Sequence, residues 1–101
     1  MADRAHVKLV TIIASYELKD RLIDQLYRLG ARDYTLSRVD GHGKHGTHAS
    51  GLFEIGNIRL ETIVAISLAE AILDAVAREA ERSELVAFAQ SIEAVPSKHF
   101  V

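Results

Sequence analysis

The chain has no cysteine and no tryptophan, and it has a single methionine and a single proline. Without cysteine it can form no disulfide, and thiolate metal sites are excluded. Its longest apolar run, from Leu9 to Ala14, is far too short to span a bilayer, so we expect no membrane-embedded segment. The first residues also lack the pattern of a secretory signal, which makes the cytoplasm the expected location.

An excess of one charge and a catalytic signature are also missing. The net charge of −2 and the pI near 6.2 argue against broad binding to nucleic acid. No Ser-His-Asp set, nucleophile elbow or paired-carboxylate signature is visible, so we expect a protein that is not an enzyme. The many aspartates and glutamates fall on the faces of predicted helices, where solvation explains them.

The composition that remains is that of a soluble globular protein. Apolar residues make up 49% of the 101 residues and charged residues 26%. This length predicts one domain, residues 1–101, that can bury a hydrophobic core without disulfides or structural metal ions. Monomers of this size are only marginally stable, so oligomerisation would help.

Four segments have the β-branched and aromatic content of strands. They cover residues 6–14, 34–39, 58–66 and 85–95. The tail of the first segment is apolar on both faces, which suits a central strand. In the last segment Val86, Phe88 and Ile92 share one face, and Pro96 closes the strand.

A first helix is predicted between the first two strands, with Ser15 as its N-cap. Its apolar stripe at helical spacing consists of Leu18, Leu22, Ile23, Leu26 and Leu29. Gly30 then supplies a left-handed stop.

A second helix is predicted after the third strand, where Ser67 and Glu70 have the spacing of a capping box. Its Arg82-Ser83-Glu84 end breaks the helical pattern. The residues that we expect it to bury are Leu68, Ile72, Ala75, Val76 and Ala80.

The order strand, helix, strand, strand, helix, strand predicts an α+β fold of the ferredoxin-like βαββαβ type. This fold has an antiparallel sheet with both helices on one face. The other face then needs a cover, because several strands are apolar on both sides. We therefore expect a cyclic homo-oligomer.

A glycine- and histidine-rich loop separates the second and third strands, and it is too long for a tight turn. Gly41 and Gly43 would let backbone N–H groups approach an anion, and Lys44 would add charge beside phosphates. This run is not a Walker motif, and a flexible surface turn explains it as well.

His42, His45 and His48 recur at every third residue of the loop, and they suggest an alternative function. Three imidazoles could bind a divalent transition metal, which would make the chain a metal-responsive binding protein. A loop with three glycines does not hold that geometry by itself, so a solvated loop with one histidine near phosphate or bicarbonate is the other interpretation. Histidine titration would make such a loop pH-sensitive.

Three stretches resemble the PII-like signalling family over nearly the whole chain. They are Gly30-Ala31-Arg32-Asp33-Tyr34-Thr35, Gly41-His42-Gly43-Lys44 and Asn57-Ile58-Arg59-Leu60-Glu61-Thr62-Ile63-Val64. The resemblance implies a trimer of ferredoxin-like subunits that binds adenine nucleotide in clefts between subunits. It also implies a flexible T-loop, about residues 41–57, that contacts a target protein.

The resemblance also implies particular binding residues. Thr35 is similar to a threonine that contacts adenine, although an ordinary strand threonine is an equal interpretation. Ile63 and Val64 would form an apolar wall for adenine, which core packing explains nearly as well. The implied phosphate contacts and basic candidates are Arg38, Gly41, His42, Gly43, Lys44 and Lys98. Arg59 and Glu61 share a strand face, where a surface or intersubunit ion pair is predicted.

Some features of nitrogen-sensing members are replaced here. Arg82-Ser83-Glu84 stands in place of a Gly-Asp-Gly-Lys phosphate loop, the loop has no tyrosine, and the ending differs. These departures weaken the expectation of triphosphate preference, 2-oxoglutarate sensing and uridylylation. The chain looks more like PII-like proteins of inorganic carbon metabolism, which implies ADP, AMP or cyclic AMP as ligand and possible binding of bicarbonate. The implied partner is a bicarbonate transporter or a carboxysome component.

Overall fold

The computed structural model describes residues 3–40 and 56–97, and it has the predicted order of elements. The elements are β1 (Ala5–Ser15), the 3-10 turn η1 (Tyr16–Leu18), α1 (Lys19–Leu29), β2 (Thr35–Val39), β3 (Asn57–Val64), α2 (Ile66–Ala80) and β4 (Leu85–Ala94). The predicted α+β, ferredoxin-like class is confirmed.

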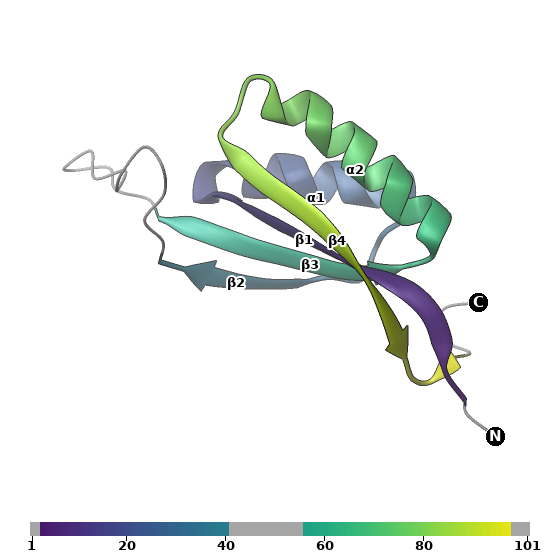
Figure 1. The fold of residues 1–101 in the computed structure, drawn as a ribbon. Coiled ribbons are helices and arrows are strands. Elements are labelled where there is room, and N and C mark those ends of the chain that lie inside the picture. The colour runs from purple at the N-terminus through teal and green to yellow at the C-terminus, as the bar shows by residue number, and fades with distance from the viewer. Residues whose placement is uncertain (1–2, 41–55, 98–101) are drawn as a thin grey trace.

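The sheet has the order β2-β3-β1-β4, and each neighbouring pair is antiparallel. Both helices cover the same face of this sheet (Figure 1). Register places Thr11 of β1 between Glu61 of β3 and Phe88 of β4. Because side chains alternate along a strand, these three side chains share the face that the helices leave open.

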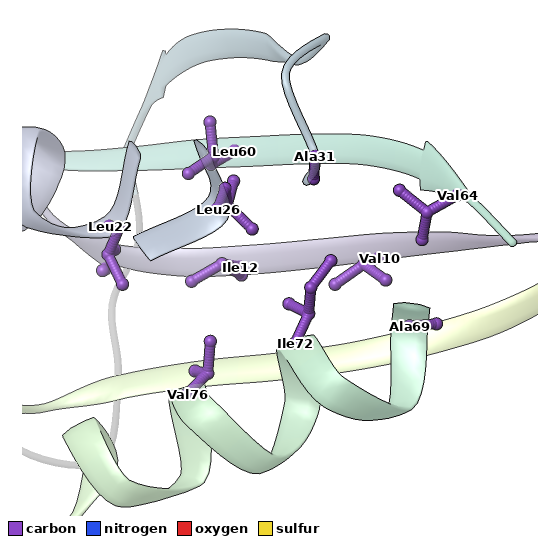
Figure 2. Packing of buried hydrophobic residues seen from close by; sticks show 11 residues of the cluster. Val10, Ile12, Leu22, Leu26, Ala31, Leu60, Val64, Ala69, Ile72 and Val76 are labelled. Atoms are coloured by element: carbon purple, nitrogen blue, oxygen red, sulfur yellow. The ribbon is translucent and has the colours of Figure 1, made fainter. Parts of the chain in front are cut away.

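The core lies between the helices and the sheet (Figure 2). Ile12 of β1 and Leu60 of β3 are 1% exposed, as are Leu22 and Leu26 of α1. The other members of the cluster are Val10, Ala14, Ala31, Val64, Ala69, Ile72 and Val76. The two helices thus bury one row from each central strand.

Both helix starts differ from the predicted caps. Ser15 has extended backbone, but its hydroxyl makes no capping bond, and the chain passes through η1 before α1 begins at Lys19. The predicted capping box of Ser67 and Glu70 is wrong, because α2 already begins at Ile66 and Ala65 occupies the N-cap position. The β3 strand ends at Val64 rather than near residue 66, so the helix starts earlier than the capping pattern indicated.

The buried stripe of α2 is shifted from the predicted one. Ile72 and Val76 are buried as expected, but Ala80 is exposed and Ala69 is buried instead. The last buried position of the helix is Glu79, one residue before the predicted Ala80. Among residues 3–40 and 56–97, neither helix has the length and apolar character that crossing a bilayer requires.

The open face of the sheet carries large apolar side chains. Val86 is 60% exposed, Phe88 41% and Ile63 40%. The period of two predicted for β4 is confirmed, since Leu85, Ala87 and Ala89 instead pack against the core. A single chain therefore leaves an apolar sheet face uncovered.

Candidate functional site

The described chain has a hollow where β2 and β3 diverge. Their ladder runs from the Val39–Asn57 pair to the Thr35–Glu61 pair, and β3 then continues alone to Val64. The hollow has a volume of about 570 Å³, which is the size of small-molecule sites. Its lining comes from residues 30–35 on one side and 61–65 on the other, together with Leu9 of β1 and Leu68 of α2.

The turn that forms one wall begins at Gly30, where α1 stops. Gly30 has a φ of 107°, the left-handed conformation that glycine adopts without a steric penalty, which confirms the predicted stop. Its N–H donates to the carbonyl of Tyr27 at 3.1 Å, and the N–H of Ala31 donates to the carbonyl of Leu26 at 2.8 Å. Ala31 is 4% exposed, so the start of the wall is anchored in the core.

Two side-chain contacts also hold the wall in place. The hydroxyl of Thr62 on β3 donates to the carbonyl of Asp33 at 2.7 Å. The guanidinium of Arg32 lies 4.7 Å from the centroid of the Tyr27 ring, the geometry of a cation–π contact. The wall is therefore attached both to α1 and to β3.

Glu61 places a carboxylate in the lining of the hollow. Its Oε2 atom accepts a hydrogen bond from the hydroxyl of Thr11 at 3.0 Å, which fixes the side chain on the open face of the sheet. Arg59 lies on the same face and is exposed. Within the described residues Glu61 makes no ion pair with Arg59, so the predicted surface pair is not formed inside one chain, and the intersubunit pair stays a prediction.

Three of the residues predicted to bind nucleotide meet in this hollow. Thr35 ends the β2–β3 ladder, and Ile63 and Val64 lie opposite the turn. Val64 is 7% exposed and also belongs to the core, whereas Ile63 is 40% exposed on the open face. The apolar wall and the threonine are thus in one place.

Arg38 is not with them. It pairs with Ile58 on the face that the helices cover, and its guanidinium lies 4.2 Å from the centroid of the Tyr16 ring. The remaining predicted positions lie outside the described residues, and they are Gly41, His42, Gly43, Lys44, His45, His48 and Lys98.

Sequence reasoning missed part of the lining. Arg32 and Tyr34 belong to it, as does Glu61, which had been assigned to an ion pair. The available signal was positional: a left-handed helix stop at Gly30, followed five residues later by the start of an edge strand. Such a turn faces the neighbouring strand of an antiparallel sheet, and its polar residues then meet the open edge of that strand.

A second polar cluster lies away from the hollow, at the end of α2. The carboxylate of Glu79 is buried and accepts hydrogen bonds from Ser83 at 2.6 Å, Arg21 at 2.8 Å and Arg82 at 3.3 Å. The Ser83 hydroxyl and the two guanidinium groups lower the pKa of Glu79 from 4.5 to about 2, against the opposing effect of burial. The prediction that solvation explains every helix carboxylate is wrong for Glu79, which instead joins α1 to the turn before β4.

No metal centre is found in the part of the chain that the structure describes. Within residues 3–40 and 56–97, no three histidine, aspartate or glutamate side chains gather as ligands would. The three histidines of the metal hypothesis lie outside that part.

The chemistry of the hollow suits a planar ligand with polar edges. Leu9, Ile63 and Val64 supply apolar surface for a ring, while β3 beyond Glu61 has no β2 partner and presents its backbone edge to the hollow. The carboxylate of Glu61 is an acceptor for hydroxyl groups. A nucleoside has these properties: a flat base with a donor and acceptor edge, joined to a sugar diol.

Comparison with protein families places the chain in a family. The model of the nitrogen regulatory protein P-II family matches residues 7–98. The chain belongs to this P-II family. The match includes β1 from Val7 onward, the turn at residues 30–35 and all of β3. A search of curated proteins found no match.

Solved structures of P-II-like proteins have the same fold. A PII-like signaling protein from Thermus thermophilus is 34% identical, with a TM-score of 0.82 over 99% of this chain and 100% of that one. The CPII protein of Thiomonas intermedia K12, solved with ADP and bicarbonate, is 25% identical, with a TM-score of 0.80 over 90% of each chain. Another CPII structure with the same identity and coverage holds ADP, AMP and bicarbonate.

Proposed function

We propose that this chain is a P-II-like regulatory protein, and not an enzyme, that binds ADP or AMP together with bicarbonate. In this proposal residues 1–101 form one domain, and three copies form a homotrimer in the cytoplasm with a nucleotide in each cleft between subunits. The T-loop, about residues 41–57, signals nucleotide binding to a protein of inorganic carbon metabolism, a bicarbonate transporter or a carboxysome component.

The observation that carries the proposal is the position of the hollow. It gathers Thr35, Ile63 and Val64, the residues that the P-II resemblance assigns to adenine, around the unpaired edge of β3. Adenine has a flat apolar surface and an edge with both donors and acceptors, which matches an apolar wall beside backbone groups. CPII, a P-II-like relative, has been solved with ADP and bicarbonate.

The ribose and the phosphates of the nucleotide need binding groups besides those for adenine. The Glu61 carboxylate, held by Thr11, accepts hydrogen bonds from the ribose hydroxyls. In this proposal Gly41, Gly43 and Lys44 receive the phosphates, as the P-II resemblance implies. His42, Lys98 and Arg38 are the other phosphate contacts that the resemblance implies, and Arg38 lies outside the hollow of its own subunit.

The open face of the sheet supports the assembly. Ile63, Val86 and Phe88 expose apolar surface there, and a second copy would remove that surface from water. Ile63 belongs both to this face and to the hollow. A subunit packed on the face would therefore lie beside the hollow and turn it into a cleft between subunits.

Isothermal titration calorimetry with AMP, ADP, ATP and cyclic AMP, each with and without bicarbonate, tests the proposed ligand. We expect saturable binding of ADP and AMP with one nucleotide per subunit. The absence of heat with all four nucleotides, with and without bicarbonate, would refute the proposal.

The Gly43→Asp variant tests the phosphate-binding role of the loop. We expect loss of nucleotide binding, because a carboxylate would repel the phosphates and a side chain would block close approach of the backbone. The matched control is Gly51→Asp, a glycine of the same segment outside the Gly41–Lys44 run. Sedimentation should show the same assembly for all three proteins. Unchanged ADP binding by Gly43→Asp would contradict this role.

A further inference from the structure

On the face of β3 that the helices cover, one side chain is polar and the others are apolar. The side chains that this strand turns toward the helices belong to Ile58, Leu60, Thr62 and Val64, and all four are buried. Thr62 is 4% exposed, so its hydroxyl is withdrawn from water inside an otherwise apolar row. A buried hydroxyl is tolerated only when it is hydrogen-bonded, and this one donates to the carbonyl of Asp33 at 2.7 Å.

The position of this bond in the sheet gives it a particular role. The β2–β3 ladder ends at the Thr35–Glu61 pair, and Thr62 is the next residue of β3. The Thr62 hydroxyl thus attaches β3 to the turn just where ladder bonds between the strands stop. Asp33 lies on the side of the hollow formed by residues 30–35, and Thr62 on the side formed by residues 61–65, so the bond joins the two sides.

We propose that Thr62 is a positioning residue for the ligand, and that its hydroxyl sets the spacing between the wall at residues 30–35 and the unpaired edge of β3. This inference rests on the proposed nucleotide site. The base enters between these two sides, so their separation must already match the thickness of an aromatic ring. In this role Thr62 acts through the wall, by holding the carbonyl of Asp33.

The wall has other attachments at its two ends. The bonds of Gly30 and Ala31 and the Arg32–Tyr27 contact hold its first residues to α1, and the Thr35–Glu61 pair holds its last residue to β3. The side-chain hydrogen bond from Thr62 attaches the middle of the wall, at Asp33, to β3. Without it, the segment before Thr35 has more conformations available, and ligand binding must order them.

The test compares Thr62→Val and Thr62→Ser with the wild type. Valine keeps the shape of threonine and suits an apolar strand position but has no hydroxyl, whereas serine keeps the hydroxyl and loses the methyl group. A hydrogen bond contributes about 0.5–1.5 kcal/mol, which corresponds to roughly two- to thirteenfold in an equilibrium constant. We expect Thr62→Val to bind ADP about two- to thirteenfold more weakly in calorimetry, and Thr62→Ser to bind close to the wild-type value.

Amide hydrogen exchange of residues 31–35 in the ligand-free protein is the second measurement, and a purely stabilising role would leave it unchanged relative to the rest of the sheet. We expect faster exchange in Thr62→Val and wild-type exchange in Thr62→Ser. The matched control is Thr11→Val, which removes a similarly buried hydroxyl from the neighbouring strand without touching the turn. It should leave exchange at residues 31–35 unchanged.

The outcomes separate this inference from the proposed function. Wild-type ADP affinity in Thr62→Val would overturn the positioning role, as would weaker binding without faster exchange. Equal loss in Thr62→Ser would assign the effect to the methyl group and also overturn it. If the wild type bound no nucleotide, the proposed function would fail, and the positioning role would fail with it even if the exchange data confirmed the attachment of the wall.

Discussion

Replacing Glu79 by glutamine removes one negative charge from the interior while keeping the size of the side chain. Glu79 is 1% exposed, and its carboxylate accepts hydrogen bonds from Arg21 of α1 and from Arg82 and Ser83 of the turn before β4. The amide of glutamine keeps one acceptor oxygen, but its NH₂ group faces donors. The variant therefore weakens the contact between α1 and the end of α2.

The magnitude follows from the exposure of the partners. Hydrogen bonds to charged groups contribute about 1.5–3 kcal/mol each, but they are not additive. The side chains of Arg21 and Arg82 are 54% and 72% exposed, so water solvates their guanidinium groups once the carboxylate is gone. We therefore expect the free energy of unfolding to fall by about 2 kcal/mol in total, close to the contribution of one hydrogen bond to a charged group. For a chain of this size that lowers Tm by about 10 °C.

The lowered pKa of Glu79 determines how the effect of the substitution on stability changes with pH. The pKa of Glu79 in the folded protein is lowered from 4.5 to about 2, chiefly by the Ser83 hydroxyl and also by the two arginines. Between these pH values the unfolded chain binds the proton and the folded protein does not. The ionised carboxylate thus stabilises the fold above its unfolded pKa, and this contribution is lost as the pH falls toward 2.

Urea unfolding followed by circular dichroism at pH 7, 4 and 3 measures the effect. The difference between wild type and Glu79→Gln should be largest at pH 7 and should shrink as the solution is acidified. Subunit concentration must be the same throughout, because the stability of an oligomer depends on it. Glu70→Gln, an exposed position on the same helix, is the matched control and should match the wild type. A difference for Glu79→Gln that is the same at all three pH values would refute the reasoning.

Two other substitutions test the fold and the assembly. Gly30→Ala should lower the free energy of unfolding in urea by about 1–2 kcal/mol, because φ is 107° at this position. A Cβ atom would have no neighbouring atom within 4 Å, so the cost is purely conformational. An unchanged midpoint would contradict the left-handed stop. Phe88→Asp should reduce the sedimentation mass to that of a monomer, because it places a charge on the apolar open face of the sheet, and an intact oligomer would show that this face is not the interface.

Residue content and periodicity in the sequence predict most of this fold. β-Branched and aromatic content identified the strands, alternation marked the two faces of β4, and the stripe containing Leu22 and Leu26 identified α1 because it faces the sheet. The Gly30 stop was predictable since it depends on one residue and one backbone conformation. Local capping was less informative: Ser67 and Glu70 match a capping pattern, yet the strand ended early and Ala65 took the N-cap position.

The site was only partly predictable for a different physical reason. Thr35, Ile63 and Val64 were found by resemblance, but the bond from Thr62 to Asp33 joins residues 29 apart and depends on where the ladder ends. The environment of Glu79 depends on Arg21, which is 58 residues away in the chain. Such pairs arise from tertiary packing, and no local pattern in the sequence specifies them.

β2 has the hollow at its Thr35 end, and the proposed T-loop follows its Val39 end in the sequence. It has five residues, from Thr35 to Val39, which is a length of about 13 Å in a strand. In Figure 1 it lies along the edge of the sheet, where one neighbour rather than two restrains it. If the chain has the proposed function, linkage makes the response reciprocal: a partner that holds the T-loop more tightly when ADP is bound must raise the affinity for ADP by the same factor. The abundance of the partner would therefore set the nucleotide concentration to which the protein responds.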